Sequence, residues 1–419
     1  MTESPSQIVF GEGAISRRAL LAGGAAMGLG ALVAACSPST NSSGHASASP
    51  ASDSGHVPGA AALRTTFQDL AKSTTTPGAA LMYRTPDGTM SATYGSGSTM
   101  RSLPITLADH FRIGSATKTF TGTVILQLAQ EGKLHIDDPV SKYRGDVPNG
   151  ANITLTQLLN MRSGLYNYSE SLELNQGMDD NPKRIWTNEE LLALAFKYPP
   201  DFPPGQGYHY SNTNFILLGL IAEKVDGRSL STSFQKRLFD PVGMRNTLFP
   251  AAGMSTLPSP HPEGYMYGTN VSTMKGAELP ADQQAAAAAG TLKPHDVTVQ
   301  DPSWAWAAGS AISTAEDMTK WVTAMGNGSL LDAAWQKKRM ESFQPVNPAA
   351  PTGPAYGFAI ARLGPMFGHT GELPGFQTFI AYDPAKKRAL VVLANLNSAP
   401  DGRAVSSTIA QGLIAKIYQ

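Results

Sequence analysis

The sequence has very little cysteine and no excess of charge of either sign. Its 419 residues include one cysteine, and its 32 lysines and arginines equal its 32 aspartates and glutamates. A lone cysteine cannot form an internal disulfide, and a balanced chain offers no basic field for nucleic acid or an anionic membrane surface. The eight histidines form no recognisable metal-binding motif, and a Gly-x-Ser-x-Gly elbow is also missing. We therefore expect no metal, no organic cofactor and no nucleic-acid partner.

Residues 1–36 have the pattern of a bacterial export signal that ends in a lipid-attachment site. An arginine pair at positions 17 and 18 precedes an apolar run, and the Val-Ala-Ala-Cys that ends at Cys36 resembles a lipobox. The paired arginines indicate the twin-arginine route. An inert thiol or a transmembrane anchor is the alternative, but the apolar run is short for a bilayer span. We expect export, with lipidation of Cys36 holding the protein at the outer face of the cytoplasmic membrane as its one membrane contact.

The next segment differs in composition from the rest of the chain. Residues 37–58 are rich in Ser, Ala, Pro and Gly and hold almost no large apolar side chain, so they cannot bury a core. This composition predicts a disordered tether. The whole chain has 42% hydrophobic residues, which supports a substantial core in the remainder. We predict one folded domain over residues 59–419.

Apolar periodicity in the folded part predicts strands from two distant segments and a helix at each end. The predicted helices are 59–73 and 405–418, and the predicted strands are 79–83, 90–94, 356–362, 376–382 and 389–394. Between them, about 115–345, the pattern is mostly helical, and the low-complexity piece 281–290 is predicted as a surface loop. The expected fold is α/β (α+β). An antiparallel sheet of five or more strands is flanked by the terminal helices, with an inserted helical lobe.

A serine nucleophile paired with a lysine base is the first candidate chemistry. Ser115 and Lys118 begin an amphipathic segment with i, i+3 spacing, which places both side chains on one face of a helix. A serine hydroxyl needs a base within hydrogen-bond reach, and a lysine whose charged form is disfavoured can serve. A capping serine with a solvated lysine is the alternative. The pattern alone is weak, because it also occurs at Ser233/Lys236 and Ser272/Lys275.

Two further motifs select the first of these matches. The Tyr-Ser-Asn that begins at Tyr210 is the only Tyr-x-Asn in the chain, and it precedes an apolar helical run. The His-Thr-Gly that begins at His369 is the only Lys/His-Thr-Gly, and it precedes a predicted strand. Ser-x-x-Lys, Tyr-x-Asn and His-Thr-Gly in this order are the signature of penicillin-recognising serine hydrolases.

On these motifs the chain resembles the serine β-lactamase-related family, penicillin-recognising and class C-like. It is most similar to the secreted D-alanyl-D-alanine carboxypeptidases with a His-Thr-Gly motif. The likeness extends over about residues 60–417. It implies a β-lactamase/DD-peptidase-like fold, β-lactams as covalent ligands and an acyl-enzyme on Ser115. Lys118 would take the proton of Ser115. Tyr210 would protonate the leaving group and later activate water.

The resemblance also implies a set of substrate-binding positions, which are Asn212, His369, Thr370, Gly371 and Trp304. Asn212 would bond near the substrate amide, with a helix N-cap as its alternative role. The triplet would lie on a strand lining the pocket, with His369 as a pH-sensitive stand-in for the lysine more common in the family. Trp304 would line the pocket as an aromatic wall, and a core role is an equal alternative.

One implied feature and two departures bear on specificity. The backbone N–H groups of Ser115 and of Phe376 or Gln377 would form the oxyanion hole. Glu372 follows the last triplet where the carboxypeptidases have threonine, and a carboxylate there would repel a substrate carboxylate unless it is paired or turned away. Arg362 is one residue out of place for the arginine that holds that carboxylate, so in a strand it would face the opposite side.

The sequence thus predicts a serine hydrolase that acts on cell-wall peptides as a D-alanyl-D-alanine carboxypeptidase. The expected partners are a small peptide or ester substrate, peptidoglycan stem peptides among them, and β-lactams. An esterase on the same scaffold is the nearest alternative, because esters need less carboxylate anchoring. A β-lactamase or a catalytically silent envelope-binding lipoprotein remains as a further alternative.

Overall fold

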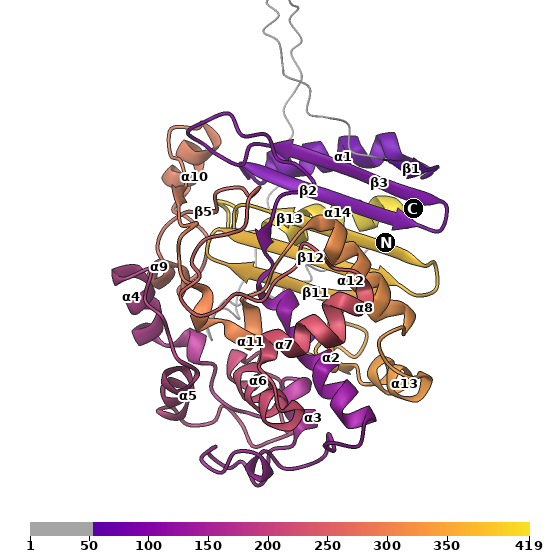
Figure 1. The fold of residues 1–419 in the computed structure, drawn as a ribbon. Helices are drawn as coiled ribbons and strands as arrows, with labels where there is room; N and C mark the ends of the chain where they lie inside the picture. The colour runs from indigo at the N-terminus through magenta and orange to yellow at the C-terminus, as the bar shows by residue number, and fades with distance from the viewer. Residues whose placement is uncertain (1–52) are drawn as a thin grey trace, which may run out of the picture.

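The computed structural model describes residues 53–419, and its centre is a nine-stranded antiparallel sheet (Figure 1). In sheet order the strands are β1 (Ser54–Gly55), β3 (Gly88–Gly95), β2 (Gly78–Thr85), β13 (Arg388–Ala394), β12 (Phe376–Asp383), β11 (Met366–Leu373), β10 (Ala361–Leu363), β9 (Ala355–Tyr356) and β8 (Gln344–Pro345). Strand β2 pairs directly with β13, so the two distant segments share one sheet. The predicted fold class is confirmed.

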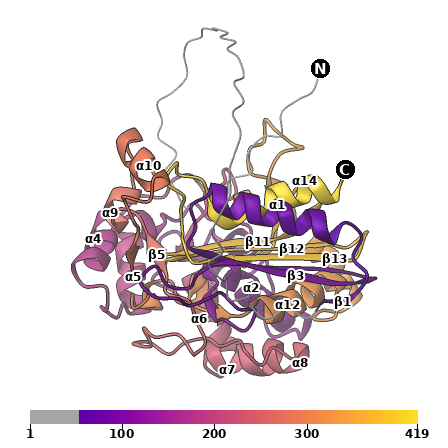
Figure 2. The ribbon, with the colours of Figure 1, turned by 90° about the horizontal axis from the view of Figure 1, so that it is seen from above.

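Helices cover both faces of this sheet (Figure 2). Helices α1 (Ala60–Ser73) and α14 (Val405–Ile417) pack against each other on one face, and α12 (Ala315–Asn327) packs on the other. Every residue of β12 is buried, as expected for a strand covered on both sides. The terminal helices predicted from periodicity are therefore present and enclose one face of the core.

Strand β11 is the longest strand that periodicity did not predict, although the family resemblance places the His-Thr-Gly triplet on a strand. Two glycines interrupt its apolar pattern, and both are required by close packing. A Cβ on Gly368 would lie 1.9 Å from the carbonyl oxygen of Ile380, and one on Gly371 would lie 2.0 Å from that of Ile113. The predicted strand 356–362 is instead split into β9 and β10, because Ala359 has a left-handed φ of 56°.

A lobe of helices lies between β3 and β8. Its α-helices are α2 (Thr117–Gln130), α3 (Leu155–Leu159), α4 (Leu172–Asp180), α5 (Asn188–Phe196), α6 (Asn212–Asp226), α7 (Leu230–Phe234), α8 (Asp240–Val242), α9 (Asn270–Thr273), α10 (Ala281–Ala288), α11 (Trp306–Gly309), α12 and α13 (Ala333–Glu341). The expectation of a surface loop over 281–290 is wrong. The alanine-rich piece forms α10 because alanine has the highest intrinsic helix propensity.

The folded part begins before residue 59, within the segment predicted as a tether. Residues Ser54–Gly55 pair with β3 at the edge of the sheet, and Val57 is buried against the core. The predicted export signal and Cys36 lie outside the described residues. Across residues 53–419, no helix has the length and apolar character needed to cross a membrane.

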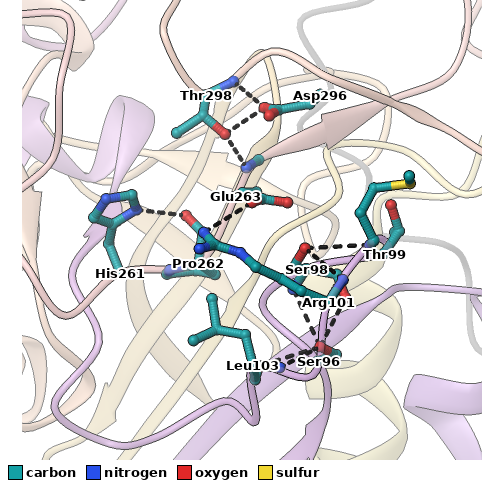
Figure 3. Close-up of polar contacts among 12 residues, drawn as sticks. Ser96, Ser98, Thr99, Arg101, Leu103, His261, Pro262, Glu263, Asp296 and Thr298 are labelled. Atoms are coloured by element: carbon teal, nitrogen blue, oxygen red, sulfur yellow. Dashed lines mark hydrogen bonds and ion pairs between the residues drawn. The ribbon is translucent and has the colours of Figure 1, made fainter.

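A polar cluster around Glu263 fixes the segment that leads to Met266, a residue of a cavity wall (Figure 3). Arg101 forms an ion pair with Glu263 at 3.0 Å, and the Glu263 amide donates to the carbonyl oxygen of Gly97 at 2.7 Å. The Tyr265 hydroxyl donates to the same carboxylate, and the Tyr265 amide donates to Asn395 at the end of β13. These contacts hold β5 (Tyr265–Met266) beside the sheet.

Candidate active site

Ser115 lies in a tight turn between the lobe and the sheet. It belongs to the 3-10 helix η1 (Gly114–Ala116), which runs directly into α2. Gly114 has a left-handed φ of 52°, and a Cβ there would lie 2.4 Å from the amide nitrogen of Glu372. Since Gly371 faces the carbonyl oxygen of Ile113 equally closely, the two glycines let β11 approach the serine turn. Because neither glycine has a side chain, strand β11 can lie directly against the turn that carries the candidate nucleophile.

Lys118 is fully buried behind Ser115, with an exposed fraction of 0%. Its Nζ lies 2.9 Å from Ser115 Oγ and 2.8 Å from the carbonyl oxygen of Ala308. The same nitrogen lies 4.7 Å from the centre of the Tyr210 ring. The side chains of Ser115, Lys118 and Tyr210 are thus brought together from the start of α2 and from the loop that precedes α6.

The other two Ser-x-x-Lys matches have different surroundings. Ser233 Oγ donates to the carboxylate of Asp226 at 2.6 Å. Ser272 Oγ donates to the carbonyl oxygen of Thr269 at 2.9 Å, at the start of a short helix. Both serines therefore make local structural bonds. Among the described residues, the hydrogen bond between a lysine and a serine of this motif occurs at Ser115 and Lys118.

The structure brings Tyr210 and Asn212 to the site in different ways. Tyr210 lines a small cavity together with Ser115, Thr370 and Gly371. Asn212 is the first residue of α6 and is buried, and its Nδ2 donates to Ser169 Oγ at 3.0 Å. Its alternative role as an N-cap is not seen, because Ser211 occupies that position. Asn212 instead joins α6 to the segment around Ser169.

His369 is buried and neutral, so the expectation of a pH-sensitive lysine substitute is wrong. Its exposed fraction is 2%, and Nε2 lies 2.9 Å from the hydroxyl of Tyr356. Nδ1–H donates to the carbonyl oxygen of Thr370, which leaves Nε2 to accept from Tyr356. Burial, and to a lesser degree the nearby Lys118, lowers the pKa of His369 to about 3. The imidazole is therefore uncharged at neutral pH.

Glu372 lies where two cavities meet. It lines the small cavity with Ser115 and also a larger cavity, whose walls include Trp304 and Met266. Two side-chain amides donate to its carboxylate, Gln377 Nε2 at 3.3 Å and Asn397 Nδ2 at 3.4 Å. The carboxylate is therefore held at the border of the two cavities.

Trp304 is a wall of the larger cavity, as the resemblance implied, and it is also nearly buried. Its carbonyl oxygen accepts from the Tyr168 hydroxyl at 2.6 Å. Arg362 lies on β10, is exposed, and places its guanidinium 5.0 Å from the ring centre of Phe343. This arginine does not line either cavity among the described residues.

The second oxyanion donor predicted at Phe376 or Gln377 stays a prediction, and the structure adds the backbone amide of Glu372 as a candidate. Phe376 is buried with its ring 6.2 Å from that of Phe111, and the side chain of Gln377 bonds to Ser406. The amide nitrogen that adjoins the serine turn is that of Glu372. Its position directly after the His-Thr-Gly triplet was the available signal.

The polar partners Gln377 and Asn397 of Glu372 were also missed. Asn397 comes from the loop after β13, far from any motif, so no sequence pattern pointed to it. Among residues 53–419, no group of three or more His, Cys, Asp or Glu side chains is placed to hold a metal ion.

Comparisons with known proteins agree with this geometry. Residues 63–413 match the family model described as Beta-lactamase. Protein flp of Staphylococcus aureus strain MW2 is 28% identical over 324 residues, which are 73% of this chain and 56% of that protein. The chain thus spans little more than half the length of this relative.

Solved structures show the same fold. A D-stereospecific amidohydrolase from Streptomyces sp. is 29% identical with a TM-score of 0.68, over 84% of this chain and 97% of that one. A D-amino acid amidase from Ochrobactrum anthropi SV3, complexed with D-phenylalanine, is 25% identical with a TM-score of 0.71, over 85% and 99%. A penicillin-binding protein from Bacillus halodurans is 25% identical with a TM-score of 0.67, over 84% and 98%. The family model spans most of the chain, so this protein belongs to the beta-lactamase family of serine hydrolases, which includes the penicillin-binding proteins.

Proposed function

We propose that the protein hydrolyses amide bonds of small substrates containing a D-amino acid, through an acyl-enzyme on Ser115. The observation that carries the proposal is the 2.9 Å contact between Lys118 Nζ and Ser115 Oγ beside a cavity that Tyr210 also lines. Complete burial favours the neutral form of an amine, which is the form that accepts a proton. The similarity to a D-stereospecific amidohydrolase and to a D-amino acid amidase supports the choice of substrate.

Acylation would begin when Ser115 Oγ attacks the substrate carbonyl and its proton passes to Lys118 Nζ. The backbone N–H groups of Ser115 and Glu372 would stabilise the oxyanion, since the Glu372 amide adjoins the serine turn. Tyr210 would donate its phenolic proton to the departing amine as the C–N bond breaks. The result is an ester of Ser115, a protonated Lys118 and a phenolate at Tyr210.

Deacylation would restore each group. The Tyr210 phenolate would take a proton from water, and the resulting hydroxide would attack the ester carbonyl. As the C–O bond to Ser115 breaks, Lys118 returns its proton to Oγ. One water is consumed, and the acid and the amine are the products, so every proton is accounted for.

A D-alanyl-D-alanine carboxypeptidase is the second candidate, and the family motifs favour it. Such a substrate carries a terminal carboxylate, which needs a cationic or donor-rich site. Among the described residues that line the two cavities, none is Lys or Arg, and two are glutamates. The charge of the cavities therefore favours an amidase, or an esterase, over a carboxypeptidase.

Localisation is proposed on the sequence alone. The arginine pair and Cys36 lead us to propose export and a lipid anchor, which would bring the enzyme to peptidoglycan peptides. The intact mass of the exported protein tests this. A mass that includes covalently attached acyl chains on Cys36 is expected, and an unmodified Cys36 in the mature protein would refute the proposed anchor.

The chemistry is tested by assaying D-amino-acid amides, D-Ala-D-Ala peptides and p-nitrophenyl esters. Wild type, Ser115→Ala and Ser272→Ala are compared, because Ser272 belongs to the same short motif in a structural setting. We expect Ser115→Ala to lose activity on the best substrate and Ser272→Ala to keep it. Wild-type turnover by Ser115→Ala would exclude the proposed nucleophile. Release of D-alanine in preference to ammonia would select the carboxypeptidase.

A further inference from the structure

The larger cavity beside the nucleophile is lined by hydrogen-bond acceptors and apolar walls. Its charged lining residues, among those described, are Glu170 and Glu372, while Met266, Trp304 and Leu373 supply apolar surface. Glu372 also lines the small cavity that holds Ser115. A substrate group bound in the larger cavity is thus next to the reacting carbonyl.

The donors around Glu372 have fixed orientations. Gln377 Oε1 accepts from the amide of Ser406 at 2.7 Å, which directs Gln377 Nε2 to Glu372 and to the carbonyl oxygen of Asn397. Asn397 Nδ2 likewise donates to Glu372. Both amides therefore present N–H groups to the carboxylate, and the oxygen of Gln377 is occupied by the Ser406 amide.

Asn397 Oδ1 is an acceptor that lacks a donor. Asn397 lines the larger cavity with an exposed fraction of 6%, and its Oδ1 has no hydrogen-bond partner among the described residues. Buried acceptors are rarely left unsatisfied, because they have lost their bonds to water. The unsatisfied oxygen and the Glu372 carboxylate belong to directly bonded side chains, so the two acceptors lie close together.

Glu170, the other carboxylate of the larger cavity, already has a cationic partner. His209 Nε2 lies 3.0 Å from its carboxylate, and Nδ1 contacts Asp201. Hydrogen bonds to Asp201 and then to Glu170 raise the pKa of His209 to about 10. The imidazolium therefore offsets the charge of Glu170 at neutral pH.

We propose that an ammonium group of the substrate binds between the Glu372 carboxylate and Asn397 Oδ1, with its side chain against Trp304 and Met266. An ammonium has three donors and a positive charge, which match these two acceptors. This inference rests on the proposed amide hydrolysis and narrows its substrates to compounds with an unblocked amine. The ammonium is either the α-amine of the acyl residue or a side-chain amine.

Substrate pairs that differ in one ammonium test the proposal and separate its two sources. D-phenylalanine p-nitroanilide is compared with its N-acetyl form, and Nα-acetyl-D-lysine p-nitroanilide with Nα-acetyl-D-norleucine p-nitroanilide. In at least one pair we expect kcat/KM about tenfold higher for the ammonium compound. The pair that shows the preference identifies the source. Ratios near one in both pairs would overturn the inference.

Variants locate the selectivity. Glu372→Gln keeps the shape and removes the charge, and we expect it to bring the preferred ratio close to one. Glu173→Gln is the matched control, because Glu173 is exposed on α4 and pairs with Lys197 outside the cavity. It should keep the wild-type ratio. An unchanged ratio in Glu372→Gln would overturn the assignment.

Binding to Ser115→Ala gives the same comparison without turnover. Calorimetry compares D-phenylalaninamide with its N-acetyl form for the α-amine, and D-lysine with its Nε-acetyl form for the side-chain amine. Acetylation of the amine that binds Glu372 should weaken binding about tenfold. Equal affinities would overturn the inference even if the enzyme proves active. Loss of wild-type turnover on every amide, with the affinity difference intact, would instead refute the proposed hydrolysis and leave the ammonium site standing.

Discussion

His369 and Glu372 lie on one strand, β11, with opposite surroundings. His369 is buried and bonded to Tyr356, and its burial holds it neutral. Glu372 is partly exposed at the border of two cavities and is held by side-chain amides. Alternate residues of a strand face opposite sides, so the strand presents the first to the protein interior and the second to substrate.

The different surroundings of His369 and Glu372 place proton transfer and substrate recognition in separate parts of the site. Proton transfer from Ser115 to Lys118 requires a neutral amine, which burial favours, and the uncharged His369 adds no cation beside it. Substrate choice requires an accessible charge, which Glu372 supplies. Substitutions around Lys118 and His369, in the interior, should therefore affect the catalytic rate and the stability of the fold. Substitutions at Glu372, beside the cavities, should affect the choice of substrate.

Loss of the base should give the largest effect. Lys118→Met keeps a long buried side chain but cannot accept the proton of Ser115, and general-base catalysis contributes about 10²- to 10⁴-fold to such rates. We expect kcat/KM to fall about 10³-fold for every substrate, with the ammonium preference unchanged. Steady-state kinetics measure this, and a melting curve checks folding. A fall of less than about tenfold would remove Lys118 from the mechanism.

A charge at the interior end should destabilise the protein. His369→Lys would place an ammonium beside Lys118, where Tyr356 now donates to a neutral ring. An uncompensated buried charge costs about 3–5 kcal/mol of unfolding free energy. His369→Gln keeps an acceptor and should cost about 1–2 kcal/mol. Urea unfolding compares them, and equal stability of His369→Lys and wild type would contradict the neutral interior.

The sequence predicted the chemistry better than the selectivity. Ser115, Lys118 and Tyr210 belong to ordered motifs, and the structure brings all three together around one hydrogen bond and one ring contact. The partners of Glu372 could not be predicted, because Asn397 comes from an unpatterned loop. Pairing of β11 with β12 and of β12 with β13 is what brings Asn397 next to Glu372.

The fold shows the same limit. Strands β12 and β13 were predicted because both are rich in apolar residues and are buried on both faces. Strand β11 was missed by periodicity because Gly368 and Gly371 occupy places where a side chain would collide with the neighbouring backbone. Where two backbone segments must approach closely, glycine replaces the apolar residues, and the sequence then lacks the hydrophobic pattern that predicts a strand.

Added salt should weaken the preference for ammonium substrates and leave the rate of the reaction at Ser115 unchanged. The Glu372 carboxylate is partly exposed, and the Debye length falls from about 10 Å at 0.1 M salt to about 3 Å at 1 M. We expect the ammonium preference to decrease about two- to threefold over this range. The kcat/KM of an uncharged ester should stay nearly constant. A preference that is insensitive to salt would contradict a charged contact at Glu372.

The ion pair of His209 with Glu170, on the opposite wall of the larger cavity, should make the stability of the protein depend slightly on pH. The folded protein raises the pKa of His209 to about 10 through Asp201 and Glu170. The stabilisation that protonated His209 gives the folded protein is therefore fully present below the pKa of the unfolded state, about 6.5. It is lost as the pH rises toward 10. The melting temperature of wild type should exceed that of His209→Gln at pH 6, and the two should converge near pH 10. A constant difference would show that the ion pair is not responsible.

The most direct test of the account is the position of the covalent intermediate. Wild type, Ser115→Ala and Glu372→Gln are quenched during reaction with a slowly hydrolysed D-amino-acid ester and with penicillin, and their peptides are mapped by mass spectrometry. We expect an acyl group on Ser115 in wild type and in Glu372→Gln, and none in Ser115→Ala. An adduct on another residue, or one that persists in Ser115→Ala, would contradict it.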